Sequence, residues 1–324
     1  MSAPLLEIRG LSTHYVSARG ARVVRAVEDV SLRLDAGETL GIVGESGSGK
    51  STLALSILRL LPPAARIVRG EIRFEGEDLL TKSNPEMRKV RGKRIAMILQ
   101  DPMASLNPLF TIGDQVAEPI RVHEGAGRGA ARSRAGELLR AVRISSPETR
   151  LAEYPHQMSG GMRQRIVGAI AISCEPRLLI ADEPTTSLDL TIQAQYLNLL
   201  RDLQRAHRLA LIFITHNLGI VARMCDSVAV MYAGRIVESG TVREIFNTPA
   251  HPYTRALLES IPRLGDAQER LAAIDGQPPD PAALPAGCAF HPRCPKAMDR
   301  CRESDPAAFA VHPDHTTRCW LWAS

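Results

Sequence analysis

The chain has 324 residues, of which 44% are hydrophobic, 23% charged and 4% aromatic, and its formal net charge is +5. Its length allows more than one domain, and its composition is that of a globular protein. The first residues lack a basic segment followed by an apolar run, and polar residues interrupt apolar stretches such as LALIFITHNLGIVA. We therefore expect an intracellular protein without membrane spans. The low aromatic content disfavours nucleic-acid binding by base stacking.

Strand-like segments alternate with helical ones along most of the chain. The predicted strands are residues 5–16, 23–34, 38–44, 70–76, 94–100, 177–182, 209–216 and a hairpin at 227–240. The predicted helices begin at Lys50, fill much of 112–173, and span 190–207. This alternation predicts an α/β fold with a mainly parallel sheet covered on both faces, and the segment 112–173 predicts an inserted helical subdomain.

The segment GESGSGKST follows a predicted strand and precedes a predicted helix, which is the setting of a phosphate-binding loop. Glycines let the backbone turn its N–H groups toward phosphate oxygens, and the start of the helix adds a positive end. A lysine at the end of the loop reaches the β- and γ-phosphates, and the next hydroxyl ligates Mg²⁺. The predicted nucleotide-binding residues are Gly44, Glu45, Ser46, Gly47, Ser48, Gly49, Lys50, Ser51 and Thr52.

Two adjacent carboxylates, Asp182 and Glu183, end the apolar segment RLLIAD. Two anions at a strand end are costly unless a cation or a reacting proton uses them. We expect Asp182 to hold Mg²⁺ and Glu183 to act as the general base toward the attacking water. Without the phosphate loop, the same pair would be read as a solvated turn.

The segment YPHQMSGGMRQR, residues 154–165, resembles the Leu-Ser-Gly-Gly-Gln signature of ABC-type ATPases, a branch of the P-loop NTPases. It departs from the signature at Met158 and Met162. The resemblance implies an ABC ATPase core with an N-terminal antiparallel β-subdomain. It also implies a head-to-tail dimer in which Ser159, Gly160 and Gly161 face the nucleotide held by the other subunit.

Further motifs of the same family follow in order. The resemblance implies that Gln100, at the end of RIAMILQ, contacts Mg²⁺ and the attacking water, and that His216 touches the γ-phosphate. It implies that the SLD loop, residues 187–189, brings Asp189 to the subunit interface. Tyr15 occupies the position where an aromatic ring stacks on adenine, although a strand aromatic packed in the core is the other interpretation.

Several features resemble the ATPase subunits of bacterial oligopeptide, dipeptide and nickel importers: QDPMASLNPLFTIGDQV after Gln100, HPYTRALL at 251–258, and the cysteine-bearing tail. This implies an ATP-hydrolysing subunit for import of peptides or similar small solutes, peripheral on the cytoplasmic face of the membrane. Its implied partners are two permeases gripped near 101–120, a second ATPase chain, and an extracytoplasmic binding protein. A nickel or other non-peptide importer, or a soluble ATPase acting on nucleic acid, are the alternatives. The predicted domains are 1–249 and a C-terminal extension, 250–324.

Four cysteines are clustered in this extension, at Cys288, Cys294, Cys301 and Cys319. An intracellular setting disfavours disulfides, and four thiolates can hold zinc or a [4Fe–4S] cluster. The chemistry alone leaves the two open, together with unliganded thiols, and the resemblance favours iron–sulfur. A metal would stabilise a segment with too little apolar content to fold unaided.

Overall fold

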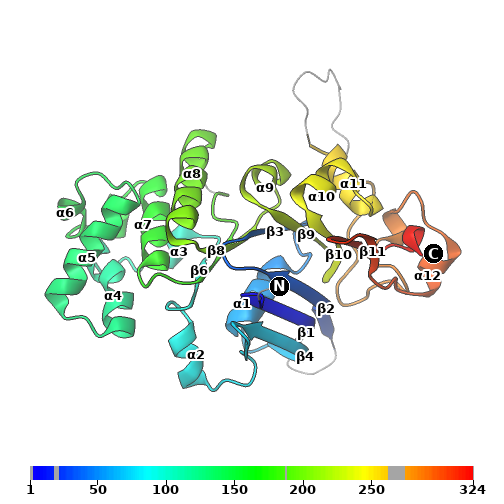
Figure 1. The fold of residues 1–324 in the computed structure, drawn as a ribbon, viewed down its shortest axis with the longest axis horizontal. Helices are drawn as coiled ribbons and strands as arrows, with labels where there is room; N and C mark the ends of the chain where they lie inside the picture. The colour runs from blue at the N-terminus through cyan, green and yellow to red at the C-terminus, as the bar shows by residue number, and fades with distance from the viewer. Residues whose placement is uncertain (1–2, 18–21, 187, 262–273, 324) are drawn as a thin grey trace. The chain divides into compact units, whose positions relative to one another are not determined.

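The computed structural model describes residues 3–17, 22–186, 188–261 and 274–323. The described residues fall into two compact units (Figure 1). The first unit lies within Met1–Leu34, Thr39–Leu80 and Ile214–Ser324, and the second within Asp35–Glu38 and Thr81–Phe213. The first unit contains residues from both sides of the predicted domain boundary at 249/250. That boundary stays a prediction.

The first unit contains an antiparallel sheet of order β2-β1-β4-β5. Its strands are β1 (Leu6–Val16), β2 (Val23–Leu34), β4 (Ala65–Phe74) and β5 (Glu77–Asp78). β1 lies between β2 and β4 and buries Leu6, Ile8 and Leu11, as the predicted antiparallel subdomain requires. β4 begins five residues before its predicted start, because Gly70 does not break it. Gly70 has φ +104 and lies against the Leu11 backbone at an irregularity in the register.

The same unit holds a second run of strands, in the order β11-β12-β10-β9-β3. They are β3 (Thr39–Val43), β9 (Ser227–Tyr232), β10 (Arg235–Thr241), β11 (Phe309–His312) and β12 (His315–Thr317). β3 is buried throughout and pairs in parallel with β9, as expected for a strand covered on both faces. β9 and β10 confirm the predicted hairpin. β12 and β11 extend it with the C-terminal segment, which the sequence did not suggest.

The helices of the first unit flank these strands (Figure 1). They are α1 (Lys50–Leu58), α9 (Leu218–Met224), α10 (Val242–Asn247), α11 (Pro252–Glu259), α12 (Asp299–Glu303) and the 3-10 turns η2 (His291–Arg293) and η3 (Trp320–Trp322). Tyr253 of α11 packs with Tyr232 of β9 and with Phe290, ring centroids lying 4.6 to 5.3 Å apart. All three rings are almost fully buried. Phe290 thus ties the cysteine-bearing segment into the core of the unit.

A buried carboxylate fixes the course of the chain beyond residue 249. Glu238 of β10 accepts hydrogen bonds from the backbone N–H groups of Ala250 and His251, at 2.6 and 2.9 Å. Its oxygen Oε1 also bonds to Nε2 of His315 on β12, at 2.7 Å. Glu238 and His315 are at most 1% exposed. Because a buried carboxylate needs such partners, this group joins β10, β12 and the start of α11.

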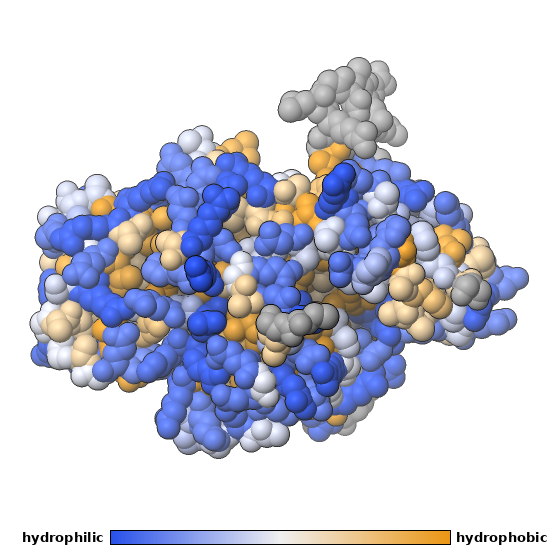
Figure 2. Space-filling view, in the orientation of Figure 1, coloured by the Kyte–Doolittle hydropathy of each residue, from blue (hydrophilic) through white to orange (hydrophobic). Residues whose placement is uncertain are grey.

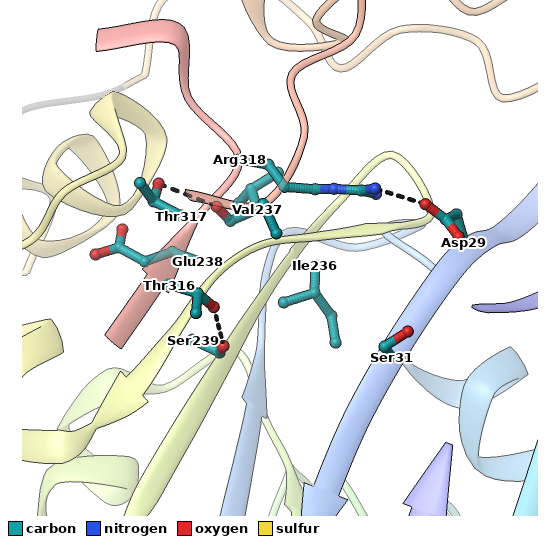
Figure 3. Close-up of a pocket in the computed structure, with 10 residues that line it drawn as sticks. Asp29, Ser31, Ile236, Val237, Glu238, Ser239, Thr316, Thr317 and Arg318 are labelled. Carbon is teal, nitrogen blue, oxygen red and sulfur yellow. Dashed lines mark hydrogen bonds and ion pairs between the residues drawn. The ribbon is translucent and has the colours of Figure 1, made fainter. Parts of the chain in front are cut away.

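A pocket lined by residues of β2, β10 and β12 shows how the C-terminal strand is attached (Figure 3). Ser239 and Thr316 share a hydrogen bond of 2.9 Å, and the Thr317 hydroxyl donates to the Val237 carbonyl. Arg318 extends across the pocket and forms an ion pair with Asp29 of β2. The C-terminal segment is therefore held by both sheets of the first unit.

The second unit contains strands in the order β8-β7-β6 and most of the helices of the central part of the chain. Its elements are α2 (Asn84–Val90), β6 (Ile95–Ile98), α3 (Pro102–Ser105), α4 (Ile112–Glu124), α5 (Arg128–Ala141), α6 (Pro147–Arg150), η1 (Pro155–Gln157), α7 (Gly160–Ile172), β7 (Leu178–Asp182), α8 (Leu190–His207) and β8 (Ala210–Ile214). β6 and β7 pair in parallel. α4 to α7 form the predicted helical region, seen in green in Figure 1.

None of the helices described is both long and apolar enough to cross a bilayer. The face shown in Figure 2 is mainly hydrophilic, with smaller apolar areas among the polar ones. The most exposed large apolar side chains include Leu109 and Leu190, at 81% and 82% exposure. Leu109 lies in the loop before α4, and Leu190 is the first residue of α8, next to Asp189.

We expect His315→Ala to destabilise the first unit, because it removes the side-chain partner of the buried Glu238 carboxylate. Breaking such a buried pair costs about 3 kcal/mol, which should lower the Tm by several degrees in calorimetry. His312→Ala is the matched control, since His312 lies on the neighbouring strand and is exposed. Equal melting temperatures for both variants would show that the Glu238–His315 bond does not stabilise the unit.

Candidate functional site

The loop from Gly44 to Gly49 connects β3 to α1 in a shape that only glycine allows at its two ends. Gly44 and Gly49 have φ +153 and +104, which side chains rarely adopt. A Cβ on Gly44 would collide with the Met231 carbonyl, and one on Gly49 with the Ala26 carbonyl. The loop is therefore held between β9 and β2. Ser46 and Gly47, in the middle of the loop, are exposed.

The loop is closed internally by the lysine that follows it. Lys50 is 6% exposed, and its Nζ donates to the carbonyls of Gly44 and Glu45 at 2.9 Å and to the Ser48 hydroxyl at 3.4 Å. An ammonium group thus lies against the concave side of the loop, as the phosphate-binding prediction expects. The role of Lys50 as an ATP ligand stays a prediction.

The hydroxyls at the start of α1 differ in exposure. Ser51 is exposed, as a group that ligates Mg²⁺ must be, and Thr52 is half-buried. The Tyr15 hydroxyl lies 3.4 Å from the Thr52 hydroxyl, so the structure brings Tyr15 to the start of this helix. Tyr15 is half-buried, which fits both adenine stacking and core packing.

In the second unit, Asp182 and Glu183 lie at the end of β7. Asp182 is 4% exposed. Glu183 has φ +45, a costly conformation for a residue other than glycine, and such strain is often found at functional positions. Gln100 donates from Nε2 to Glu183 Oε2 at 3.1 Å, and the Thr186 hydroxyl donates to the same oxygen at 3.0 Å. The structure therefore brings Gln100 and Glu183 together, and it adds Thr186, which sequence reasoning missed.

The oxygen donors proposed for magnesium suit that ion chemically. They are a hydroxyl at Ser51, an amide oxygen at Gln100 and a carboxylate at Asp182, and Mg²⁺ prefers oxygen ligands. The amide nitrogen of Gln100 is engaged by Glu183, so the oxygen is the atom suited to a metal. This chemistry fits Mg²⁺, and the assignment of the three ligands stays a prediction.

His216 follows β8 and is exposed. The preceding residue, Thr215, donates its N–H to the carbonyl of Ile42 on β3 at 3.2 Å. β3 leads directly into the phosphate loop. The hydrogen bond therefore places Thr215, the residue before His216, beside the strand that carries this loop. Asn217 then caps α9 by accepting from the N–H groups of Gly219 and Ile220. A role at the γ-phosphate stays a prediction.

The signature segment forms the start of α7. Ser159 is its N-cap and accepts from the Met162 N–H at 3.3 Å, and both Ser159 and Gly160 are exposed. Gly161 packs closely on Ile192 of α8. Met158, one of the two departures from the signature, is 3% exposed and fills an apolar site. An unbranched apolar side chain can replace leucine there, so this departure does not alter the exposed N-cap.

The predicted interface residue Asp189 has a local structural role as well. Its Oδ1 accepts from the N–H groups of Thr191 and Ile192, both at 3.0 Å, and so caps α8. Ser187, in the same SLD loop, lies outside the described residues. Leu190, the next residue after the cap, is 82% exposed. Asp189 and Leu190 are thus on the surface, where a second subunit could reach them.

The four clustered cysteines lie near one another in the first unit. Burial raises the pKa of Cys288 to about 12 and that of Cys319 to about 11, and neighbouring thiols add to both shifts. Burial also raises the pKa of Cys294, again with help from Cys301. Among the residues described, no group of three or more His, Cys, Asp or Glu side chains is arranged as a metal site. The iron–sulfur centre therefore stays a prediction.

Comparison with known proteins gives matches over nearly the whole chain. The family described as "ABC transporter" matches residues 27–186, and that described as "Oligopeptide/dipeptide transporter, C-terminal region" matches residues 237–301. A probable peptide ABC transporter ATP-binding protein of Sinorhizobium fredii is 52% identical over 98% of this chain and 94% of its own. The oligopeptide transport ATP-binding protein OppD of Bacillus subtilis is 51% identical over 98% of this chain and 88% of its own.

Solved structures match the fold. The ATP-binding cassette MJ0796, in a dimeric post-hydrolysis state with ADP and Pi, gives a TM-score of 0.66 at 25% identity. The match covers 74% of this chain and 99% of that one. CbiO1 of Clostridium perfringens, part of an ABC transporter complex, gives a TM-score of 0.65 at 26% identity, over 76% of this chain and 92% of that one.

We expect Gly49→Ala to abolish or strongly weaken Mg·ATP binding, because the new methyl group would collide with the Ala26 carbonyl and force the loop open. Gly76→Ala is a matched control. Gly76 also has a positive φ, of +82, but its Cβ would meet no atom within 4 Å. Nucleotide titration should therefore separate the two variants. Unchanged ATP affinity of Gly49→Ala would contradict the role of this loop.

Proposed function

Because the chain belongs to the ABC transporter family of ATP-binding proteins, we propose that it is the ATPase subunit of a bacterial importer of dipeptides, oligopeptides or similar small solutes. The observation that carries this proposal is the match over 98% of the chain to ATP-binding proteins named for peptide transport. The match of residues 237–301 to the oligopeptide/dipeptide C-terminal region supports the same branch. Neither alternative, a non-peptide cargo or action on nucleic acid, has a comparable observation in its favour.

The proposed hydrolytic step uses the residues that the sequence predicts for it. The loop 44–52 would bind the phosphates of ATP, with Lys50 reaching the β- and γ-phosphates. Mg²⁺, held by Ser51, Gln100 and Asp182, would neutralise phosphate charge. Glu183 would accept a proton from the attacking water, and the Gln100 and Thr186 hydrogen bonds would fix the orientation of its carboxylate. His216 would contact the γ-phosphate, and Tyr15 would stack on adenine.

ATP hydrolysis would be completed by a second ATPase chain. Ser159, Gly160 and Gly161 would offer the start of α7 to the nucleotide of that chain, and Asp189 would lie at the same interface. The exposure of Ser159 and Gly160 supports this role, as does the dimeric state of the solved MJ0796 structure. We propose that the second chain is a non-identical sister ATPase.

Coupling to transport requires contact with two integral membrane permeases. The segment 101–120, which precedes and enters α4, is proposed to grip a permease helix. Leu109 and Phe110 in this segment are 81% and 54% exposed, which is costly in water unless a partner covers them. The chain would then be peripheral on the cytoplasmic face of the membrane. A substrate-binding protein on the opposite side would deliver the solute, and dimer closure on ATP would drive the permeases.

We expect Glu183→Gln to abolish ATP turnover while leaving Mg·ATP binding intact, because the amide keeps the shape of the carboxylate but cannot accept the proton. Loss of a general base typically costs about 10²–10⁴-fold in rate. Phosphate release and nucleotide titration on the same sample measure the two effects separately. Lys50→Ala should show the opposite pattern, with loss of binding. Near-normal turnover of Glu183→Gln would exclude it as the base.

We also propose that Cys288, Cys294, Cys301 and Cys319 bind a [4Fe–4S] cluster, with Zn²⁺ as the alternative. Supporting this, the four thiols influence one another electrostatically, so that deprotonating several of them without a metal would be unfavourable. A bound cation removes this penalty by stabilising the thiolates. The donor set therefore suits the group.

Protein purified without oxygen should show broad visible absorption and contain about four irons per chain. Cys301→Ser should lose the colour and most of the iron, whereas Cys174→Ser, outside the cluster, should keep both. In metal-free protein the raised pKa values of Cys288 and Cys319 predict slow alkylation at neutral pH that accelerates toward pH 11–12. Colourless protein with one zinc per chain would favour the alternative.

A further inference from the structure

The phosphate loop of the first unit carries an acidic side chain, Glu45, directly after Gly44 in the segment proposed to bind the phosphates of ATP. Like charges repel, so a free carboxylate in this loop would weaken the binding of a polyphosphate. In the structure the carboxylate is not free. Arg293 donates from one terminal nitrogen to Glu45 Oε2 at 2.7 Å and from the other to Oε1 at 3.0 Å. This is the bidentate geometry of a strong arginine–carboxylate pair.

Arg293 is fixed in place by a complete set of acceptors. Its Nε donates to the Asp275 carbonyl at 3.0 Å, and its terminal nitrogens also reach the Ile274 carbonyl at 3.3 Å and the Tyr232 hydroxyl at 3.4 Å. Together with the two Glu45 oxygens, these account for the five N–H donors of a guanidinium. The side chain is only 4% exposed, and the bond to Glu45 raises the pKa of Arg293. A fully exposed pair would contribute little, whereas the guanidinium of this one is buried and the Glu45 carboxylate is 27% exposed.

A second group from the C-terminal part of the chain holds the backbone of the same loop residue. The Tyr253 hydroxyl accepts a hydrogen bond from the Glu45 N–H at 2.9 Å. The Glu45 carbonyl accepts from Lys50 Nζ, also at 2.9 Å. Glu45 is therefore held at its N–H, its carbonyl and its carboxylate. Two of these three contacts come from residues more than 200 positions later in the chain.

The segment that supplies Arg293 also supplies two of the clustered cysteines. Arg293 ends the 3-10 turn η2, between Cys288 and Cys294, and this turn is closed by hydrogen bonds from the His291 N–H to the Cys288 carbonyl and from the Cys294 N–H to the His291 carbonyl. Phe290 of the same segment packs on Tyr253 and Tyr232. The guanidinium is thus presented to the loop by a short, well-packed turn.

We infer that Arg293 is a positioning residue for the nucleotide: it neutralises Glu45 and, with Tyr253, fixes the first half of the phosphate loop in its binding shape. This inference rests on the proposed ATP site at residues 44–52. It assigns the C-terminal extension a direct part in nucleotide affinity, through an ion pair that spans 248 residues of sequence. Arg293 does not touch the reacting atoms, so its loss should raise the Kd and KM for Mg·ATP while leaving kcat at saturating ATP nearly unchanged.

The test is a titration of Mg·ATP against the full chain and its variants, with ATPase kinetics on the same samples. Arg293→Gln should raise the Kd roughly tenfold, which corresponds to about 1.4 kcal/mol. The double variant Arg293→Gln with Glu45→Gln should recover most of the affinity, because the uncompensated negative charge is gone. A purely structural anchor would not show this rescue. Tyr253→Phe, which removes only a hydroxyl, should weaken binding severalfold with the aromatic packing kept.

Arg318→Gln is the matched control. Arg318 also ties the C-terminal segment to the rest of the unit, through its ion pair with Asp29 of β2 (Figure 3) rather than through an ion pair with Glu45. It should leave the Kd unchanged. An equal loss in Arg318→Gln and Arg293→Gln, an unchanged Kd in Arg293→Gln, or no recovery in the double variant would each overturn the inference.

The proposed function has its own readout in the same experiment. If the unaltered chain binds Mg·ATP and Lys50→Ala does not, the proposed ATP site is supported, whether or not Arg293→Gln changes the affinity for Mg·ATP. If the unaltered chain fails to bind Mg·ATP, the proposed site is wrong and the role of Arg293 falls with it.

Discussion

The close approach of two backbone carbonyls to the phosphate loop is the constraint on which the rest of the first unit depends. The carbonyls of Ala26 on β2 and Met231 on β9 leave no space for a side chain at Gly49 or Gly44. The loop is therefore shaped by strands from two different sheets, and Lys50 can close it from inside. A loop this tightly held needs little reordering when phosphate binds, which reduces the entropic cost of binding.

Two carboxylates in the first unit join distant parts of the chain through their hydrogen bonds. Glu238 is hydrogen-bonded to His315 of β12 and to the backbone at the start of α11. Glu45 forms an ion pair with Arg293. In each case a carboxylate on β10 or on the phosphate loop bonds to a side chain from beyond residue 290. Such pairs add specificity because each charge is costly unless its own partner is in place. The C-terminal segment thus makes specific contacts with β10 and with the phosphate loop of this unit.

Much of the fold was predictable because its local patterns are strong. The helix 190–207 was predicted with correct bounds, since its apolar periodicity starts directly after an aspartate that can cap it. The setting of the phosphate loop between a strand and a helix was also predictable, from spacing, whereas the hydrogen bond between Gln100 and Glu183 was not predicted. The strands at 309–317 were not, because FAVHPDHTT is short and interrupted by proline, and its pairing with β10 is a tertiary effect. Arg293 could not be linked to Glu45 from sequence, since no local pattern relates residues so far apart.

The pairing of β12 with β10 has a consequence for how the chain behaves outside its assembly. β10 would otherwise be the last strand of the run β10-β9-β3, with a row of unpaired backbone N–H and C=O groups. An unpaired edge of this kind recruits strands from other molecules and promotes aggregation. β12 pairs with β10 at Glu238 and Ser239, so the described run of strands ends instead at β11, which has four residues. A short edge strand offers few backbone groups to strands of other molecules, which disfavours edge-to-edge association.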